Sequence, residues 1–147
     1  MRAPREATPA SGRMAVPVAA VMSTRAVQIP ESASLRETQA LAARYDYNSF
    51  PVVAPDGRLV GMLTKGDLLR AARAAALDGT VWARPVSEWT GRTTAWLRAQ
   101  DSVAMAVELM VTSGLRSLPV IDQDERVVAM VSRNDLILAL SAEEELR

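Results

Sequence analysis

Short apolar segments and amphipathic stretches follow one another along the chain in an order that occurs twice. Residues 27–29 and 95–97 are apolar or alternating over a few positions, which predicts two short strands. Ser34 and Glu37 have the spacing of a capping box, which predicts that a helix begins after Ser34. The apolar stripes predicted on the first helix of each half are Leu35, Thr38, Leu41 and Ala42, and then Val103, Ala106, Val107, Met110 and Val111.

Each half continues with two β-rich segments joined by a short turn. The paired segments are 50–54 with 59–63, and 118–122 with 127–131. Pro55, Asp56 and Gly57 form the first turn, and such short connections predict hairpins. A second helix is expected to begin after Thr64 in the first half and after Ser132 in the second. Each half therefore has the predicted order β-α-β-β-α.

The two halves are copies of one unit. At a shift of 68 residues, 14 of the 56 positions from 17 to 72 are identical. One copy of roughly 55 residues is marginal for an independent core, whereas two copies can bury their apolar faces against each other. We therefore expect an α/β (α+β) fold of two βαββα repeats, packed with pseudo-two-fold symmetry around a cleft. The predicted boundaries are a disordered tail at 1–13, repeat one at 14–78, a linker at 79–84 and repeat two at 85–147.

Composition and charge remove several classes of function. The chain has neither cysteine nor histidine, which excludes thiol chemistry within it and removes the commonest acid–base residue and metal ligand. Lys and Arg together number 17, as do Asp and Glu, so no net charge favours nucleic acid. No apolar run approaches the roughly 18 residues of a membrane span, and no secretory signal is recognisable. We expect a cytoplasmic, non-catalytic protein without a metal site.

A hydroxyl and a carboxylate stand three residues apart at the start of each second helix, as Thr64 with Asp67 and Ser132 with Asp135. The pair can act as a helix cap, in which the hydroxyl accepts a backbone N–H and the carboxylate favours the helix dipole. The same arrangement can bind a nucleotide, since free N–H groups at a helix start receive phosphate and a carboxylate accepts both hydroxyls of a ribose. The two interpretations are compatible, and the residues leave both open.

A longer pattern surrounds this motif in both copies: Pro-Val-Val or Pro-Val-Ile, a turn, and then Val-(Gly/Ala)-Met-(Leu/Val)-(Thr/Ser)-x-x-Asp-Leu. The pattern resembles the CBS domain, named after cystathionine β-synthase, which occurs in tandem pairs called Bateman modules. The resemblance covers about residues 16–141. It implies a regulatory, ligand-sensing module that binds AMP, ADP, ATP or S-adenosylmethionine in the cleft between the repeats, without catalysis.

The resemblance also implies which residues contact that ligand. Asp67 and Asp135 would hold ribose, while Thr64 and Ser132 would approach phosphate. The segments at 24–27 and 93–96 resemble strands whose backbone meets the adenine edge. Arg116 stands where related modules often have a basic phosphate contact, and copy one has Asn48 there. Arg133 and Lys65 are basic side chains that could also reach phosphate, and the alternative for either is a solvated surface charge. The full set of implied ligand-binding residues is Thr24, Ala26, Val27, Thr64, Asp67, Thr94, Ala95, Arg116, Ser132, Arg133 and Asp135.

The copies differ close to the expected ligand. Gly61 of copy one is replaced by Ala129, which is expected to crowd that side, and Trp96 adds a bulky side chain to copy two. Two unequal sites are therefore expected, and the sequence leaves open which of them is occupied and by which ligand. Trp82, Trp89 and Trp96 recur every seven residues, and packing in a core or a dimer interface is favoured over base stacking.

A second function is compatible with the same sequence. Bateman modules pair through their helices, head-to-head or head-to-tail, so the chain could instead be a ligand-free homodimerisation or partner-docking module. The apolar helix faces and the tryptophans suit such an interface. Under either function, the output is expected to pass to a separate, unidentified regulated protein.

Overall fold

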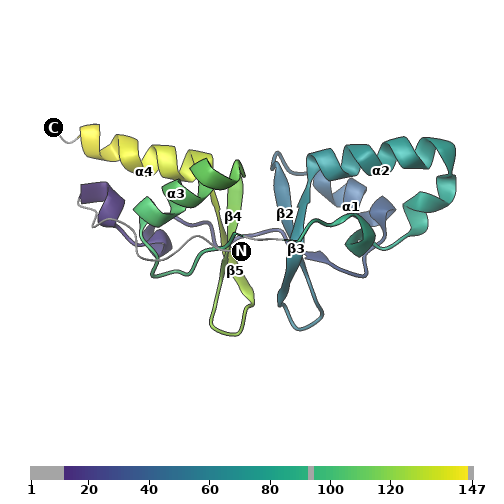
Figure 1. The fold of residues 1–147 in the computed structure, drawn as a ribbon, viewed down its shortest axis with the longest axis horizontal. Helices are drawn as coiled ribbons and strands as arrows, with labels where there is room; N and C mark the ends of the chain where they lie inside the picture. Colours follow the sequence, from purple (N-terminus) through teal and green to yellow (C-terminus); the bar gives the residue numbers. More distant parts are fainter. Residues whose placement is uncertain (1–11, 93–94, 146–147) are drawn as a thin grey trace. The chain divides into compact units, whose positions relative to one another are not determined.

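In the computed structural model, the backbone is described for residues 12–92 and 95–145, and the chain divides into two compact units (Figure 1). The first unit combines residues 12–26 with residues 95–145, and the second unit is the continuous segment 27–92. The expected tail at 1–13 lies outside the described residues except for its last two, which begin the 3₁₀ turn η1 (Gly12–Ala15). The first unit is thus assembled from two separated stretches of sequence.

The second unit contains a three-stranded sheet and two α-helices. Its elements in chain order are β1 (Ile29–Pro30), α1 (Leu35–Ala42), β2 (Ser49–Val53), β3 (Leu59–Thr64), α2 (Lys65–Leu77), η3 (Gly79–Ala83) and η4 (Val86–Trp89). Strand β1 runs parallel to β2, and β2 pairs antiparallel with β3. Both α-helices lie on one side of the β2–β3 hairpin (Figure 1).

The first unit repeats this plan. Its elements are η1, η2 (Val18–Ala20), α3 (Val103–Ser113), β4 (Ser117–Ile121), β5 (Val127–Ser132) and α4 (Arg133–Glu145). Strands β4 and β5 are antiparallel, and Leu97 adds a single parallel bridge to Val120. The predicted mixed α/β fold with two repeats of strand and helix units is confirmed. The predicted opening strands are shorter than expected, because only Ile29–Pro30 and Leu97 reach a hydrogen-bonding partner strand.

Each unit is completed by the segment that precedes the other copy's first strand. In the first unit, the amide of Val18 donates to the carbonyl of Asp101 at 2.7 Å. In the second unit, the amide of Val86 donates to the carbonyl of Ala33, also at 2.7 Å. The shift of 68 residues relates Val18 to Val86 and Ala33 to Asp101, so one contact is made twice with the segments exchanged. Both valines are completely buried, which makes each segment part of the core that it completes.

The exchange extends to the last strand of each unit. Ser23 pairs with Met130 of β5 through hydrogen bonds of 2.8 and 2.9 Å. Gly91, which is equivalent to Ser23, pairs with Met62 of β3 through hydrogen bonds of 3.0 and 3.2 Å. The two stretches from Val18 to Ser23 and from Val86 to Gly91 are called the exchanged segments. They run beside β5 and β3, the strands that lead directly into α4 and α2.

The cores follow the predicted apolar stripes with one exception. Most members of both stripes are buried or half-buried, but Val111 of α3 is 75% exposed. The prediction for Val111 is wrong because Met105 and Leu109 are buried instead, and at about 100° per residue they move the buried face away from Val111. Trp82 and Trp89 are half-buried against the core of the second unit, in agreement with a packing role.

The two hairpin turns have the same backbone conformation but different residues. Gly57 has a φ of 89°, and Glu125, which is equivalent to it, has a φ of 64°. The amide of each residue donates to the carbonyl three residues earlier, Ala54 at 2.9 Å and Asp122 at 3.0 Å. Left-handed backbone costs a residue with a Cβ atom about 1 kcal/mol. Copy two therefore carries backbone strain that glycine removes from copy one.

Candidate functional site

The predicted hydroxyl and carboxylate pairs form reciprocal helix caps. The Thr64 hydroxyl accepts the amide N–H of Asp67 at 3.0 Å, and the Asp67 carboxylate accepts the amide N–H of Thr64 at 2.7 Å. Ser132 and Asp135 repeat both hydrogen bonds, at 3.1 and 2.8 Å. The capping interpretation is therefore confirmed in both copies. Since capping occupies only Oδ2 of each carboxylate, it leaves Oδ1 for another partner.

A second backbone contact fixes the approach to each helix. The amide of Lys65 donates to the carbonyl of Asn48 at 3.0 Å, and the amide of Arg133 donates to the carbonyl of Arg116 at 3.0 Å. Each contact joins the first residue of a helix to the residue just before the strand of the same hairpin. The backbones of Arg116 and Arg133 are therefore hydrogen-bonded neighbours at the start of α4.

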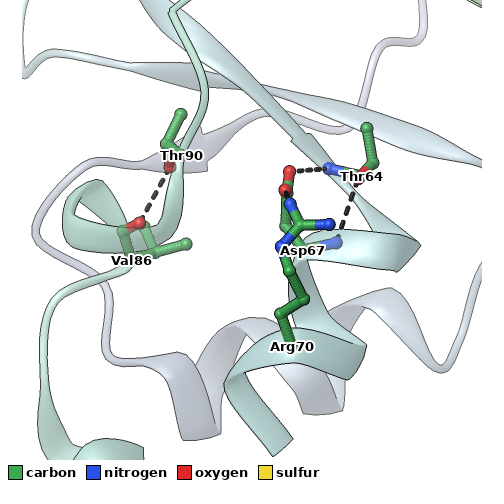
Figure 2. A network of polar contacts seen from close by, with 5 residues as sticks. All are labelled: Thr64, Asp67, Arg70, Val86 and Thr90. Carbon is green, nitrogen blue, oxygen red and sulfur yellow. Dashed lines mark hydrogen bonds and ion pairs between the residues drawn. The ribbon is translucent and has the colours of Figure 1, made fainter. Parts of the chain in front are cut away.

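The outer carboxylate oxygens of the two caps have different surroundings. In the second unit, Oδ1 of Asp67 forms an ion pair with the guanidinium of Arg70, one turn along α2 (Figure 2). Asp67 is only 7% exposed. In the first unit, Leu138 stands at the position equivalent to Arg70, and Asp135 is half-buried. Sequence reasoning missed Arg70, although its spacing of three residues from Asp67 is that of an ion pair on one helix face.

The basic side chains near the two helix starts also differ. Lys65 is half-buried, and its Nζ donates to the carbonyl of Tyr45 at 3.2 Å. Arg116 and Arg133 are exposed, and within the described part of the chain neither guanidinium makes a hydrogen bond or ion pair. At the start of α4, two cationic groups therefore have no partner among the described residues, while the lysine of α2 is held by a backbone carbonyl.

The segments expected at the adenine edge are divided between the units. Thr24 and Ala26 follow Ser23 in the first unit, beside β5, and Ala95 belongs to the same unit, where it is buried. Val27 belongs to the second unit and is half-buried. Thr94 lies outside the described residues. The first unit thus holds Thr24, Ala26, Ala95, Arg116, Ser132, Arg133 and Asp135, and the second holds Val27, Thr64 and Asp67.

The glycine of β3 is required by the exchanged segment. A Cβ atom on Gly61 would lie 2.2 Å from the carbonyl oxygen of Gly91 and 2.9 Å from Cγ2 of Thr90. Thr90 is fixed in turn by its hydroxyl, which donates to the carbonyl of Val86 at 2.8 Å (Figure 2). In the first unit, β5 accommodates Ala129 completely buried while its neighbour keeps both hydrogen bonds to the exchanged segment.

No group of three or more His, Cys, Asp or Glu side chains in the described residues is placed to hold a metal ion. None of the helices described has the length and apolarity needed to cross a bilayer.

Curated proteins similar in sequence include two of comparable size. An uncharacterised 17.7 kDa protein of Acidianus ambivalens is 24% identical over 127 residues, which are 86% of this chain and 74% of that protein. The CBS domain-containing protein YhcV of Bacillus subtilis is 30% identical over 115 residues, 78% of this chain and 79% of that protein. By contrast, the chain spans only 23% of a homoserine O-acetyltransferase of Methanocorpusculum labreanum, to which it is 26% identical over 119 residues.

Solved structures show the same fold over most of the chain. The CBS-pair protein CBSX2 from Arabidopsis thaliana has a TM-score of 0.79 at 20% identity, over 88% of this chain and 97% of that one. A structure of CBSX2 in complex with AMP has a TM-score of 0.75 at 21% identity, over 90% of this chain and 99% of that one. The CBS domain pair of protein MJ0100, in complex with 5′-methylthioadenosine and S-adenosyl-L-methionine, has a TM-score of 0.73 at 21% identity, over 85% of this chain and 99% of that one.

The family model of the CBS domain matches residues 18–74 and residues 86–142. The two matches fall on the two copies that the internal repeat defines, and together they cover most of the sequence. The paired caps, the repeated hairpins and these matches agree, and the chain therefore belongs to the CBS domain family, with two CBS domains in tandem.

Proposed function

We propose that this CBS pair is a regulatory module that binds an adenine nucleotide or S-adenosylmethionine and leaves it chemically unchanged. The observation that carries the proposal is the capped helix start with a carboxylate, present in both units beside an exchanged backbone segment. A helix start attracts anionic groups, and a carboxylate accepts hydroxyl donors such as those of a ribose. A ligand with both phosphate and ribose matches these two properties.

The ligands of the related structures support the choice of an adenosyl compound. CBSX2 has been solved with AMP, and the MJ0100 pair with 5′-methylthioadenosine and S-adenosyl-L-methionine. These three molecules share the adenosyl group and differ in charge at the 5′ position. The adenosyl group is therefore the part of the ligand that the proposal fixes most firmly.

Isothermal titration of the full chain with AMP, ADP, ATP and S-adenosylmethionine tests the proposal. At least one ligand is expected to bind in the micromolar range and to be recovered unchanged. Asp135→Asn should weaken binding at least tenfold, or about 1.4 kcal/mol. Asp124→Asn, which alters an exposed carboxylate in the β4–β5 turn, is the matched control and should have no effect. Failure of all four ligands to bind below millimolar concentration would contradict the proposal.

A second candidate function is homodimerisation or partner docking, and exposed apolar side chains favour it. Leu69 of α2 is 72% exposed, and Ile137 of α4, which is equivalent to it, is 59% exposed. Leu138, next to Ile137 on α4, is also 61% exposed, and neighbouring exposed apolar side chains mark interaction surfaces more than single ones do. Light scattering should then report a dimer, which Leu69→Glu with Ile137→Glu converts to a monomer. A wild-type monomer at micromolar concentration would contradict the homodimer.

A further inference from the structure

Building on the proposed function, we infer that Arg70 blocks the ribose position of the second unit. The start of α4, with Asp135, Arg116 and Arg133, is then the position that binds a nucleoside phosphate. The two CBS domains are unequal because one carboxylate is engaged by the protein itself while the other is left for a ligand.

Both oxygens of the Asp67 carboxylate already have partners. Oδ2 accepts the amide of Thr64, and Oδ1 is paired with the guanidinium of Arg70 (Figure 2). The Asp67 side chain is 9% exposed, so little of it is open to a molecule in solution. A ribose could reach this carboxylate only by displacing Arg70. Its hydroxyls would then replace an ion pair between two opposite charges with hydrogen bonds from uncharged donors to the same carboxylate, and the guanidinium of Arg70 would lose its partner.

The Asp135 carboxylate is open by comparison. Its Oδ2 accepts the amide of Ser132, and within the described residues its Oδ1 has no hydrogen bond or ion pair. Leu138, at the position of Arg70, cannot donate a hydrogen bond and is 61% exposed. A ribose diol therefore finds an unoccupied acceptor at Asp135 without displacing any protein group.

The positions of Arg116 and Arg133 also favour the start of α4 as the place where an anion binds. Arg116 and Arg133 are joined through the backbone hydrogen bond of 3.0 Å, and both guanidiniums are exposed. At the other helix start, Asn48 is neutral and Lys65 is held by the Tyr45 carbonyl. An arginine binds phosphate through two parallel N–H donors, and two arginines beside a helix start favour a phosphate over an uncharged group. The expected ligand class is thus a nucleoside phosphate such as AMP.

Exchanging the two residues between the repeats tests this assignment. Titration with AMP should give one site per wild-type chain. Arg70→Leu, which gives α2 the residue type of α4, should add a second AMP site that is weaker than the first, because Asn48 and Lys65 supply less positive charge for the phosphate. Leu138→Arg should weaken the original site at least tenfold. Arg73→Leu, which removes an exposed arginine one turn away, is the control and should leave stoichiometry and affinity unchanged. If Arg70→Leu fails to fold, Arg70→Gln provides the same comparison with a shorter, uncharged group.

Two titration results would overturn the inference. Two equal AMP sites in the wild-type chain would show that Arg70 does not block the second unit. A loss of AMP affinity in Arg70→Leu would show that Arg70 contacts the phosphate instead.

Side-chain NMR of the arginines separates failure of this inference from failure of the proposed function. The Nη2–H signal of Arg70, the group paired with Asp67, should stay in place on addition of AMP, while the guanidinium signals of Arg116 and Arg133 shift. A shift of the Arg70 signal with AMP would overturn the assignment although the proposed function holds. If AMP, ADP, ATP and S-adenosylmethionine all leave every signal unmoved, the proposed function fails and the open site fails with it.

Discussion

The starts of α2 and α4 have the same backbone and different surroundings. Each is capped by a hydroxyl and a carboxylate three residues apart, and each donates its first helical amide to the residue before the preceding hairpin. Beyond these contacts they diverge, since an ion pair satisfies Asp67, while Oδ1 of Asp135 has no hydrogen bond or ion pair with any residue that the structure describes. The comparison separates what the fold requires, which both copies keep, from what a ligand could use, which only one copy presents.

The largest expected effect on stability comes from disrupting the packing of the segments around Val18 and Val86, each of which lies beside the strand that leads into α4 or α2. Val18→Asp and Val86→Asp each place a charge in a completely buried position, which should cost about 4 kcal/mol or more. Hydrogen exchange measured by mass spectrometry should then show lost protection in β4 and β5 for Val18→Asp, and in β2 and β3 for Val86→Asp. Ala19→Asp and Ser87→Asp, at the exposed neighbouring positions, are the controls. Lost protection in β2 and β3 for Val18→Asp would show that Val18 does not pack in the unit of β4 and β5.

The contrast between Gly61 and Ala129 should give the next largest effect. Gly61→Ala places a Cβ atom 2.2 Å from the Gly91 carbonyl oxygen and should destabilise the chain by about 2–3 kcal/mol. Ala129→Gly removes a buried methyl group and adds backbone freedom, at a cost of about 1 kcal/mol. Urea denaturation of both variants measures the difference. Equal costs would mean that the exchanged segments approach β3 and β5 equally closely.

Removing the two capping carboxylates should distinguish them by stability. Asp67→Ala removes a helix cap and leaves Arg70 unpaired, and it should lower the free energy of unfolding by about 2 kcal/mol. The loss is no larger because solvent screens the ion pair of an arginine that is 57% exposed. Asp135→Ala removes only a cap and should cost about 1 kcal/mol. Denaturation in the absence and presence of 1 M NaCl measures both costs. Salt should reduce the difference between the two stability losses, because it screens the ion pair. A larger loss for Asp135→Ala than for Asp67→Ala would argue against the ion pair of Asp67 with Arg70.

The smallest effect concerns the hairpin turns. Gly57→Ala places a Cβ atom on left-handed backbone and should destabilise the chain by about 1 kcal/mol. Glu125→Gly relieves the same strain in copy two, but it also increases the freedom of the unfolded chain. The net gain should therefore be at most about 0.5 kcal/mol. Thermal melting of both variants should show shifts of opposite sign, and a destabilising Glu125→Gly would show that side-chain contacts of Glu125 outweigh its backbone strain.

Local spacing in the sequence predicted the caps and the hairpins well, because these depend on residues three to five positions apart. The exchange of Val18 and Val86 was not predicted, since aligning the chain with itself gives the same identities whichever copy a segment packs against. The burial of Val111 was mispredicted because a stripe on one helix does not determine where the sheet lies. Arg70 was missed because the comparison emphasised residues that the copies share, and it is a residue by which they differ.

The arrangement of the two units along the chain has a consequence for synthesis on the ribosome. The second unit is continuous, so all of its residues are available once position 92 has left the exit tunnel. The first unit needs residues 12–26 and also α4, so its earlier segment cannot complete the unit until α4 has been translated. At about 5–20 residues per second, the roughly 120 residues between position 26 and the end of α4 take about 6 to 24 seconds to synthesise. During that time the apolar side chain of Val18 has no core to enter, and exposed apolar surface of this kind is what chaperones bind during synthesis.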